Sequence, residues 1–115
     1  MSLDTTAKRF VELCNQGKNV DVMHSMYASD IVSVEADGRR WSGKDSVIQK
    51  AADWGASTTI NSEKVEGPYF NGPEQFAVHF TFEVTRNDSG KRETLDELAI
   101  YTVKDDQITR EEFFY

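Results

Sequence analysis

The sequence predicts an α+β domain in which three helices are followed by a four-stranded antiparallel meander. Apolar residues recur at helical spacing through the first half of the chain, and they alternate with polar residues from about residue 58 onward. Three short turn clusters divide this second half into four segments, and turns this short join antiparallel neighbours. A chain of 115 residues can bury one core, so we expect residues 1–115 to form a single domain.

The three helices are delimited by residues that favour helix ends. They are predicted over residues 4–16, over residues 20–27, and from the Ser42-Gly43-Lys44-Asp45 sequence to Gly55. Gly17 ends the first helix in the usual C-terminal manner, and Ser29 with Asp30 closes the second. The sequence that begins at Ser42 resembles a capping box with Asp in place of the usual Glu, so it opens the third helix.

The strands are predicted from β-branched runs and from alternation. A short strand covers residues 31–36, and four longer strands lie near residues 58–70, 75–86, 92–103 and 107–115. Proline cannot donate a hydrogen bond to a neighbouring strand, so Gly67-Pro68 predicts a bulge or bend in the first long strand. Strands of this length must twist and curl. Helices over one face of a curled sheet enclose a conical hollow that suits a ligand.

Charge and composition exclude several classes of function. Thirteen basic against twenty acidic side chains give a net charge of −7, which argues against a nucleic-acid partner and against an anionic membrane surface. One cysteine and two histidines are too few for a disulfide framework or a common zinc cluster, and there is no glycine-rich phosphate loop. We therefore expect no metal and no cofactor. No segment resembles a signal peptide or approaches the roughly 20 apolar residues of a membrane span, so we expect a cytoplasmic location.

Several short sequences along the chain together resemble one protein family. They are Phe10-Val11-Glu12-Leu13, Met26-Tyr27-Ala28-Ser29-Asp30, Val34-Glu35-Ala36, Ser42-Gly43-Lys44, Gly67-Pro68 and Ile108-Thr109-Arg110-Glu111-Glu112-Phe113-Phe114-Tyr115. By their order and spacing, the chain resembles the SnoaL-like and ketosteroid-isomerase-like branch of the nuclear transport factor 2 (NTF2-like) superfamily. The resemblance implies a cystatin-like cone, in which three N-terminal helices pack on a strongly curved, mainly antiparallel sheet. It does not imply one activity, because this fold hosts many.

The resemblance also implies a catalytic carboxylate. In the isomerases an aspartate base lies eight residues after the tyrosine that ends the second helix, and Glu35 holds that position after Tyr27. We therefore expect Glu35 to carry a proton, although a solvated strand end is an equally good interpretation. The two oxyanion donors of the isomerases fall on Phe10 and Ala99, which cannot donate a hydrogen bond. Since one such donor contributes about 2.7–4 kcal/mol to transition-state stabilisation, we expect no steroid isomerase activity.

Glu97 and Tyr101 are candidate catalytic residues because they share a strand face with Ala99. If Ala99 faces the hollow, as the resemblance implies, a glutamate and a phenol face it too. A glutamate on an apolar face needs a partner or stays protonated. The alternative is an edge position in which Glu97 reaches water or pairs with a basic residue.

Glu111 shares its strand face with Phe113 and Tyr115, which by the resemblance face the hollow. Its charged neighbours suit a surface strand equally well. With Glu35 and Glu97, Glu111 could form an acidic cluster in one cavity. Paired carboxylates push their pKa values apart, which is how one site holds both an acid and a base.

Aromatic residues are expected to supply the remaining ligand contacts. Phe80 and Phe82 lie on the apolar face of their strand, and Trp54 could cover the pocket, although core packing explains Trp54 as well. Cys14 is expected to be buried and inert, and His79 to be structural. The candidate ligand-binding residues are therefore Phe10, Trp54, Phe80, Phe82, Ala99, Glu111, Phe113 and Tyr115.

Two functional hypotheses follow from these features. In the first, the protein binds a small apolar organic molecule and performs cofactor-free acid–base chemistry, such as isomerisation, aldol-type cyclisation, dehydration or hydrolysis, with Glu35 carrying the proton. In the second, it is a non-catalytic ligand-binding or protein-interaction module. A pocket carboxylate that titrates near neutral pH would favour the first. Under either hypothesis, the apolar outer face of the sheet, which includes Leu98 and Ile100, predicts a homodimer.

Overall fold

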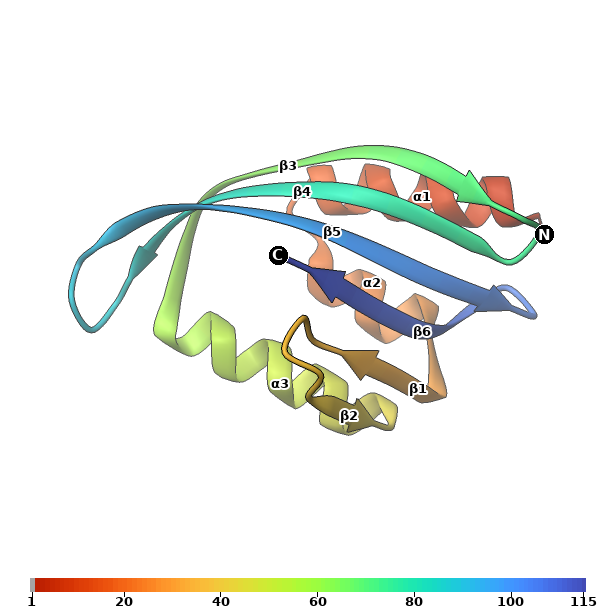
Figure 1. Ribbon diagram of the computed structural model, residues 1–115, viewed down its shortest axis with the longest axis horizontal. Helices are drawn as coiled ribbons and strands as arrows, with labels where there is room; N and C mark the ends of the chain where they lie inside the picture. Colours follow the sequence, from red (N-terminus) through yellow and green to blue (C-terminus); the bar gives the residue numbers. More distant parts are fainter. Residues whose placement is uncertain (1) are drawn as a thin grey trace.

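Residues 2–115, which the computed structural model describes, form one strongly curved sheet of six strands with three helices on its concave face (Figure 1). The helices are α1 (Leu3–Asn15), α2 (Asn19–Met26) and α3 (Lys44–Ser57). The strands are β1 (Tyr27–Val34), β2 (Arg40–Ser42), β3 (Thr58–Asn71), β4 (Gln75–Arg86), β5 (Arg92–Lys104) and β6 (Gln107–Phe114). This arrangement confirms the predicted α+β fold class.

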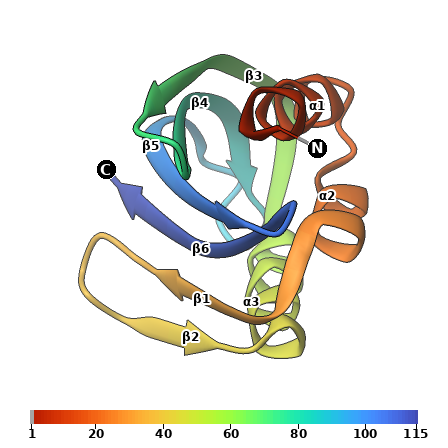
Figure 2. The same ribbon diagram turned by 90° about the vertical axis from the view of Figure 1, so that its right-hand side faces the viewer.

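The strand order in the sheet is β2-β1-β6-β5-β4-β3. Neighbouring strands run antiparallel except β1 and β6, which are parallel. Figure 2 shows the resulting cone, in which α1 packs against the end of the sheet formed by β3 and β4, and α3 packs near β1 and β2. The parallel pair places the first strand of the chain beside the last, with Ser33 opposite Glu111.

The first helix begins and ends at residues that suit those positions. Ser2 is the N-cap, and its hydroxyl oxygen accepts a hydrogen bond from the backbone N–H of Thr5 at 3.2 Å. Gly17 follows the helix with a φ of 74°, a left-handed conformation that glycine adopts at little cost. The buried residues of α1 include Phe10 and Cys14, and the helix packs on β3 and β4. Burial raises the pKa of the Cys14 thiol, as expected for an inert cysteine.

The boundary between α2 and β1 differs from the prediction. The helix ends at Met26, and Tyr27 is the first residue of β1, so Ser29 and Asp30 lie within the strand and do not close the helix. Tyr27 has an extended backbone and pairs with Ile108 of β6, so it belongs to the strand and not to the helix. The partner lies near the other end of the chain, so the local apolar spacing could not reveal it.

The surroundings of α3 also differ from the prediction. Gly43, with a φ of 91°, is the N-cap, and no side chain caps the helix, so the predicted capping box is not formed. The Gly43 N–H instead donates to the Ile31 carbonyl oxygen at 2.8 Å, which ties this turn to β1. The helix continues past Gly55 to Ser57. The short edge strand β2, which the sequence analysis did not predict, pairs with β1.

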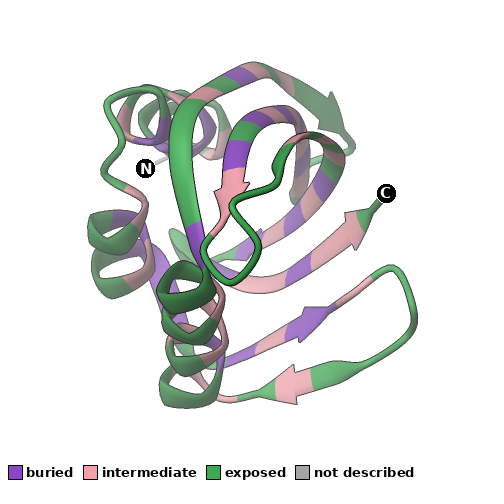
Figure 3. Ribbon diagram, turned by 90° about the vertical axis from the view of Figure 1, so that its left-hand side faces the viewer, coloured by how far each residue is buried: buried purple, intermediate pink, exposed green. Residues whose placement is uncertain are grey.

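The long strands bend where their pairing is irregular. The register of β3 against β4 shifts between Glu66 and Tyr69, so the bulge predicted at Gly67-Pro68 is confirmed. A second shift, between Ile60 and Ser62, was not predicted. Along β4, buried residues alternate with more exposed ones (Figure 3), as expected for a sheet that is covered on one face.

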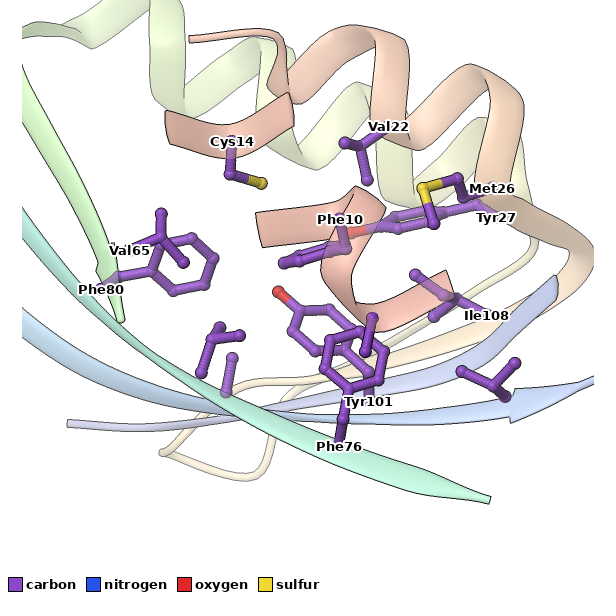
Figure 4. Packing of buried hydrophobic residues seen from close by; sticks show 14 of the residues in the cluster. Phe10, Cys14, Val22, Met26, Tyr27, Val65, Phe76, Phe80, Tyr101 and Ile108 are labelled. Carbon is purple, nitrogen blue, oxygen red and sulfur yellow. The ribbon is translucent and has the colours of Figure 1, made fainter. Parts of the chain in front are cut away.

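Part of the core lies between α1 and the strands β4 and β5 (Figure 4). The centroid of the Phe10 ring lies 5.3 Å from that of Phe76 and 4.5 Å from that of Tyr101. Aromatic contacts of this kind add to the stabilisation that burial provides. Within residues 2–115, none of the helices combines the length and the apolar character that a membrane span requires.

Candidate functional site

A cavity of about 570 Å³ lies between the helices and the concave face of the sheet. This volume falls in the range of small-molecule sites. Its wall is mainly apolar and aromatic, and a group of charged side chains reaches it from α3, β5, β6 and the end of β1. The residues predicted from the sequence that line it are Phe10, Glu35, Trp54, Phe80, Phe82, Glu97, Tyr101, Glu111 and Phe113.

Two residues that were expected to face the hollow lie outside the cavity wall. Ala99 is fully buried between Val78 and Phe113 of the neighbouring strands, and its methyl group is too short to reach past larger side chains. Tyr115 follows the end of β6 and is 65% exposed. Neither residue lines the cavity, which differs from the expectation that both face it. Desolvation, followed by the charges of Glu35, Asp37 and Glu97, raises the pKa of Tyr115.

Glu111 is a buried carboxylate, with only 3% of its surface exposed. The Tyr27 hydroxyl donates a short hydrogen bond to Oε1, and the Ser33 hydroxyl donates one to Oε2 at 2.7 Å. Burial raises the pKa of Glu111, whereas these two hydrogen bonds and the charge of Lys50 oppose the rise. Both carboxylate oxygens therefore have partners, which makes the burial of this group tolerable.

Lys50 enters the same network from α3, and the sequence analysis missed it. Its Nζ donates a hydrogen bond to Ser33 Oγ at 2.6 Å. The same nitrogen lies 3.8 Å from Glu35 Oε1 and 3.8 Å from Glu111 Oε2. A single ammonium group therefore stands between two carboxylates of the cavity.

Two aromatic rings flank the Lys50 ammonium. Its Nζ lies 4.8 Å from the centroid of Trp41 and 5.0 Å from that of Phe113, which are cation–π distances. One sequence signal could have found this residue: Lys50 falls on the same helical stripe as Val47 and Trp54, where an apolar residue is expected. A lysine on an apolar stripe indicates that its charge meets a partner inside the fold.

Glu35 reaches the cavity from the turn that follows β1, as predicted. The backbone N–H of Glu35 donates to the Arg39 carbonyl oxygen at 2.9 Å, and the Gly38 N–H donates to the Glu35 carbonyl oxygen at 2.9 Å. This tight turn fixes the position of the residue. Its side chain is 21% exposed and faces Lys50, so Glu35 is a paired carboxylate and not a solvated strand end.

Glu97 lies half-buried on β5, opposite Phe80 of β4, and it faces the cavity. No side chain or backbone group of residues 2–115 gives its carboxylate a hydrogen bond or an ion pair. Burial and the negative charge of Glu35 raise the pKa of Glu97 to about 7, although Lys50 opposes the rise. A carboxyl group with this pKa can both accept and donate a proton near neutral pH.

The Tyr101 hydroxyl is a second polar group of the cavity that lacks a hydrogen bond from the described residues. Its ring is 2% exposed and stacks on Phe76. Figure 4 shows the hydroxyl oxygen directed toward the space between Phe10 and Phe80. Burial, followed by the charge of Glu111, raises the pKa of Tyr101 well above its usual value. The group is therefore a neutral phenol that can donate a hydrogen bond to a ligand.

His79 lies on the opposite face of the sheet from the cavity. Its Nδ1 is 3.3 Å from Glu66 Oε1, and its Nε2 is 3.0 Å from Asp96 Oδ1, so both ring nitrogens have carboxylate neighbours. These contacts link β3, β4 and β5 and fit a structural histidine. Within residues 2–115, no three side chains of the His, Cys, Asp and Glu types are grouped in a way that could hold a metal ion.

Comparisons with known proteins agree with this architecture. The model of the SnoaL-like domain family matches residues 1–115. A Mesorhizobium loti protein, described as a candidate SnoaL-like polyketide cyclase and also as a carbohydrate phosphatase, is 42% identical, with a TM-score of 0.94 over 100% of both chains. A comparison with curated proteins found no match.

More distant solved structures share the fold. A candidate polyketide cyclase from Pseudomonas putida is 15% identical with a TM-score of 0.80, and the match covers 100% of this chain and 92% of that one. A protein from Catenulispora acidiphila with a ketosteroid isomerase-like fold, crystallised with trimethylamine, is 15% identical with a TM-score of 0.73, covering 96% of this chain and 84% of that one. The family model and the 42% identical structure together show that this chain belongs to the SnoaL-like domain family.

Proposed function

We propose that this protein binds a small, largely apolar organic molecule in the aromatic cavity and catalyses a cofactor-free acid–base reaction on it. The observation that carries this proposal is Glu97, a half-buried carboxylate that faces the cavity without a protein partner. Burying an unpartnered carboxyl group costs free energy, and a passive apolar pocket gains nothing from it. A perturbed carboxyl group in a cavity is typical of a catalytic site.

The aromatic wall supports the binding of an apolar ligand. The rings of Phe80 and Phe82 are stacked with centroids 5.3 Å apart, and Trp54 stands edge-on to Phe82 at 5.9 Å. Such a wall offers a large apolar contact area with few rotatable bonds. The Tyr101 hydroxyl would orient the ligand by donating a hydrogen bond to an oxygen or nitrogen acceptor.

Glu97 carries the proton in this proposal, and Glu35 supports it. Glu35 faces Lys50 at 3.8 Å, whereas the Glu97 carboxylate has no competing cation within ion-pair distance. Ionised Glu97 would remove a proton from a carbon beside an electron-withdrawing group and return it to another atom of the same molecule. The negative charge of Glu35 raises the pKa of Glu97 and so makes it a stronger base. The description of relatives as candidate polyketide cyclases favours an aldol-type cyclisation among the possible reactions.

Deuterium exchange tests proton abstraction without knowledge of the natural substrate. The probe is 2-tetralone, an apolar bicyclic ketone, incubated with the protein in D2O and followed by proton NMR. We expect the protein to accelerate exchange of the protons beside the carbonyl group and Glu97→Gln to lower the protein-dependent rate by roughly 10²–10⁴-fold, the usual contribution of a general base. Asp96→Asn is the control, because Asp96 is the adjacent residue on the outer face of the same strand.

A non-catalytic binding module is the alternative, and one observation favours it. Phe10 and Ala99, at the positions where the isomerases carry their oxyanion donors, are apolar and buried here. The catalytic proposal fails if 2-tetralone binds but its protons exchange no faster than in buffer, or if they exchange equally fast with Glu97→Gln. The protein would then be a non-catalytic binding module.

A further inference from the structure

Lys50 has hydrogen-bonding capacity that the fold does not use. An ammonium group carries three N–H donors. Among residues 2–115, only Ser33 Oγ accepts a hydrogen bond from Lys50 Nζ, at 2.6 Å. The two carboxylate oxygens at 3.8 Å attract the charge but lie beyond hydrogen-bond distance. The side chain is 16% exposed and lines the cavity, so the remaining donors have few other acceptors available.

The surroundings hold the ammonium in place without neutralising it completely. Ser33 fixes one donor, and the faces of Trp41 and Phe113 lie at 4.8 and 5.0 Å. The carboxylates of Glu35 and Glu111, each 3.8 Å away, offset part of the charge, but neither accepts a hydrogen bond, so two N–H donors of Lys50 remain available to a ligand. The position is thus set before a ligand enters, which is the condition for strong electrostatic stabilisation of developing charge.

We infer that Lys50 is the group that receives a ligand oxygen as that oxygen gains negative charge, and this inference rests on the proposed acid–base function. The substrate class that suits this role of Lys50 is a neutral carbonyl compound with an acidic C–H bond. A ligand that is already anionic, such as a carboxylate or a phosphate, would meet four carboxyl groups of the cavity wall, which outnumber its two cations, Arg39 and Lys50. A neutral carbonyl compound avoids that repulsion and becomes negative only when it reacts.

The step balances with the groups present. The Glu97 carboxylate takes the proton from the carbon beside the carbonyl group. The electron pair of the broken C–H bond forms a carbon–carbon double bond, and the carbonyl π pair moves to the oxygen, which accepts a hydrogen bond from Lys50. Protonated Glu97 then returns the proton to carbon. Lys50 thereby takes the role of an oxyanion donor that Phe10 and Ala99 cannot fill.

The acidity of a bound chromogenic phenol measures this effect without any turnover. The probe is 4-nitro-1-naphthol, whose absorbance reports its ionisation, and the matched ligand 1-methoxy-4-nitronaphthalene, which cannot ionise, measures binding alone. We expect the naphthol bound to the wild-type protein to be at least about tenfold more acidic than the naphthol bound to Lys50→Met. Lys50→Arg should stay close to wild type, and so should Lys64→Met, which removes the same charge from an exposed strand position.

Lys50→Gln keeps the test decisive if Lys50→Met does not fold, because its amide removes the charge but can still donate a hydrogen bond to Ser33 Oγ. The naphthol bound to Lys50→Gln should likewise be at least about tenfold less acidic than the naphthol bound to wild type. Equal acidity in wild type and in whichever of the two Lys50 variants folds would overturn the role of Lys50. If the methoxy compound binds but the acidity of the bound naphthol is the same in wild type and in the Lys50 variants, the apolar cavity is still a ligand site. In that case only the role proposed for Lys50 is wrong. If neither compound binds, the proposed ligand site and the role of Lys50 both fail.

Discussion

Ser33 and Glu111 lie opposite each other on the parallel strands β1 and β6, and a hydrogen bond of 2.7 Å joins Ser33 Oγ to Glu111 Oε2. The same Ser33 oxygen accepts a hydrogen bond from Lys50 at 2.6 Å. One small hydroxyl thus connects the buried carboxylate of the last strand to the lysine of α3. Its contribution to folding and to the site can be measured.

Replacing this hydroxyl should destabilise the protein. In Ser33→Ala, the buried Glu111 oxygen and the Lys50 ammonium each lose a partner, so we expect the free energy of unfolding to fall by about 1–3 kcal/mol. Urea unfolding followed by tryptophan fluorescence measures the change. Ser29→Ala, at an exposed position of the same strand, is the control. Equal stability of the two variants would show that the hydrogen bonds of Ser33 contribute little.

Two tyrosine hydroxyls of the cavity should differ in what they contribute. Tyr27→Phe removes a donor to the buried Glu111, and we expect it to cost about 1–3 kcal/mol of stability. Tyr101→Phe removes a hydroxyl without a protein partner, so stability should stay within about 0.5 kcal/mol. Binding of 2-tetralone should weaken in Tyr101→Phe, as calorimetry would show. The reverse order of stabilities would contradict the assignment of the two hydroxyls.

Glu97 should make the stability of the protein depend on pH. The pKa of Glu97 rises from its ordinary value of 4.5 to about 7 on folding. Between these values the folded state binds more protons than the unfolded state, so stability falls as pH rises through this window. Because Glu97→Gln removes this effect, the variant should lose less stability than wild type between about pH 5 and about pH 8. Unfolding at the two pH values gives the comparison, with Glu12→Gln as an exposed control of equal charge change. An unchanged pH dependence in Glu97→Gln would refute the raised pKa.

The protein should not isomerise Δ5-ketosteroids at an appreciable rate. By the family resemblance, Phe10 and Ala99 fall at the positions of the two hydrogen-bond donors of the isomerases; both side chains are apolar and buried. Loss of one such donor alone costs about 2.7–4 kcal/mol of transition-state stabilisation. An absorbance assay for the conjugated product tests this directly. Strong turnover would require other donors, and Lys50 and Tyr101 would be the first to replace.

We further propose that the protein forms a homodimer through the outer face of its sheet. Leu98 is 49% exposed and Phe114 is 45% exposed, and the two are cross-strand neighbours on this face. Exposed apolar pairs of this kind often mark an interface, and a two-fold pair is the simplest closed arrangement. Light scattering after size exclusion should give twice the chain mass of 13.1 kDa, and Ile100→Lys should halve it. A wild-type mass near 13.1 kDa would exclude the dimer at that concentration.

Local patterns were enough to predict much of the sheet and part of the site. Alternation placed Phe80 and Phe82 on the inner face of β4, and the same period of two on β5 placed Glu97 and Tyr101 inside. These assignments depend only on the pleat of a single strand. Alternation predicts which face of the sheet a side chain points to, but not whether that side chain reaches the cavity. Ala99 lies on the inner face, yet it is fully buried and does not line the cavity.

The sequence by itself determined the order of the three helices and of every strand except the short β2, the concave face of the long strands and the presence of carboxylates on it. Only the tertiary structure decided which carboxylate is free. Parallel pairing of β1 with β6 joins Ser33 to Glu111 across 78 positions, and α3 brings Lys50 between Glu35 and Glu111. Glu97 receives no such partner. Contacts between distant segments form only when the whole chain folds, so they leave no local spacing in the sequence that could be recognised. They nevertheless bury Glu97 and Glu111 and thereby raise the pKa of both carboxyl groups.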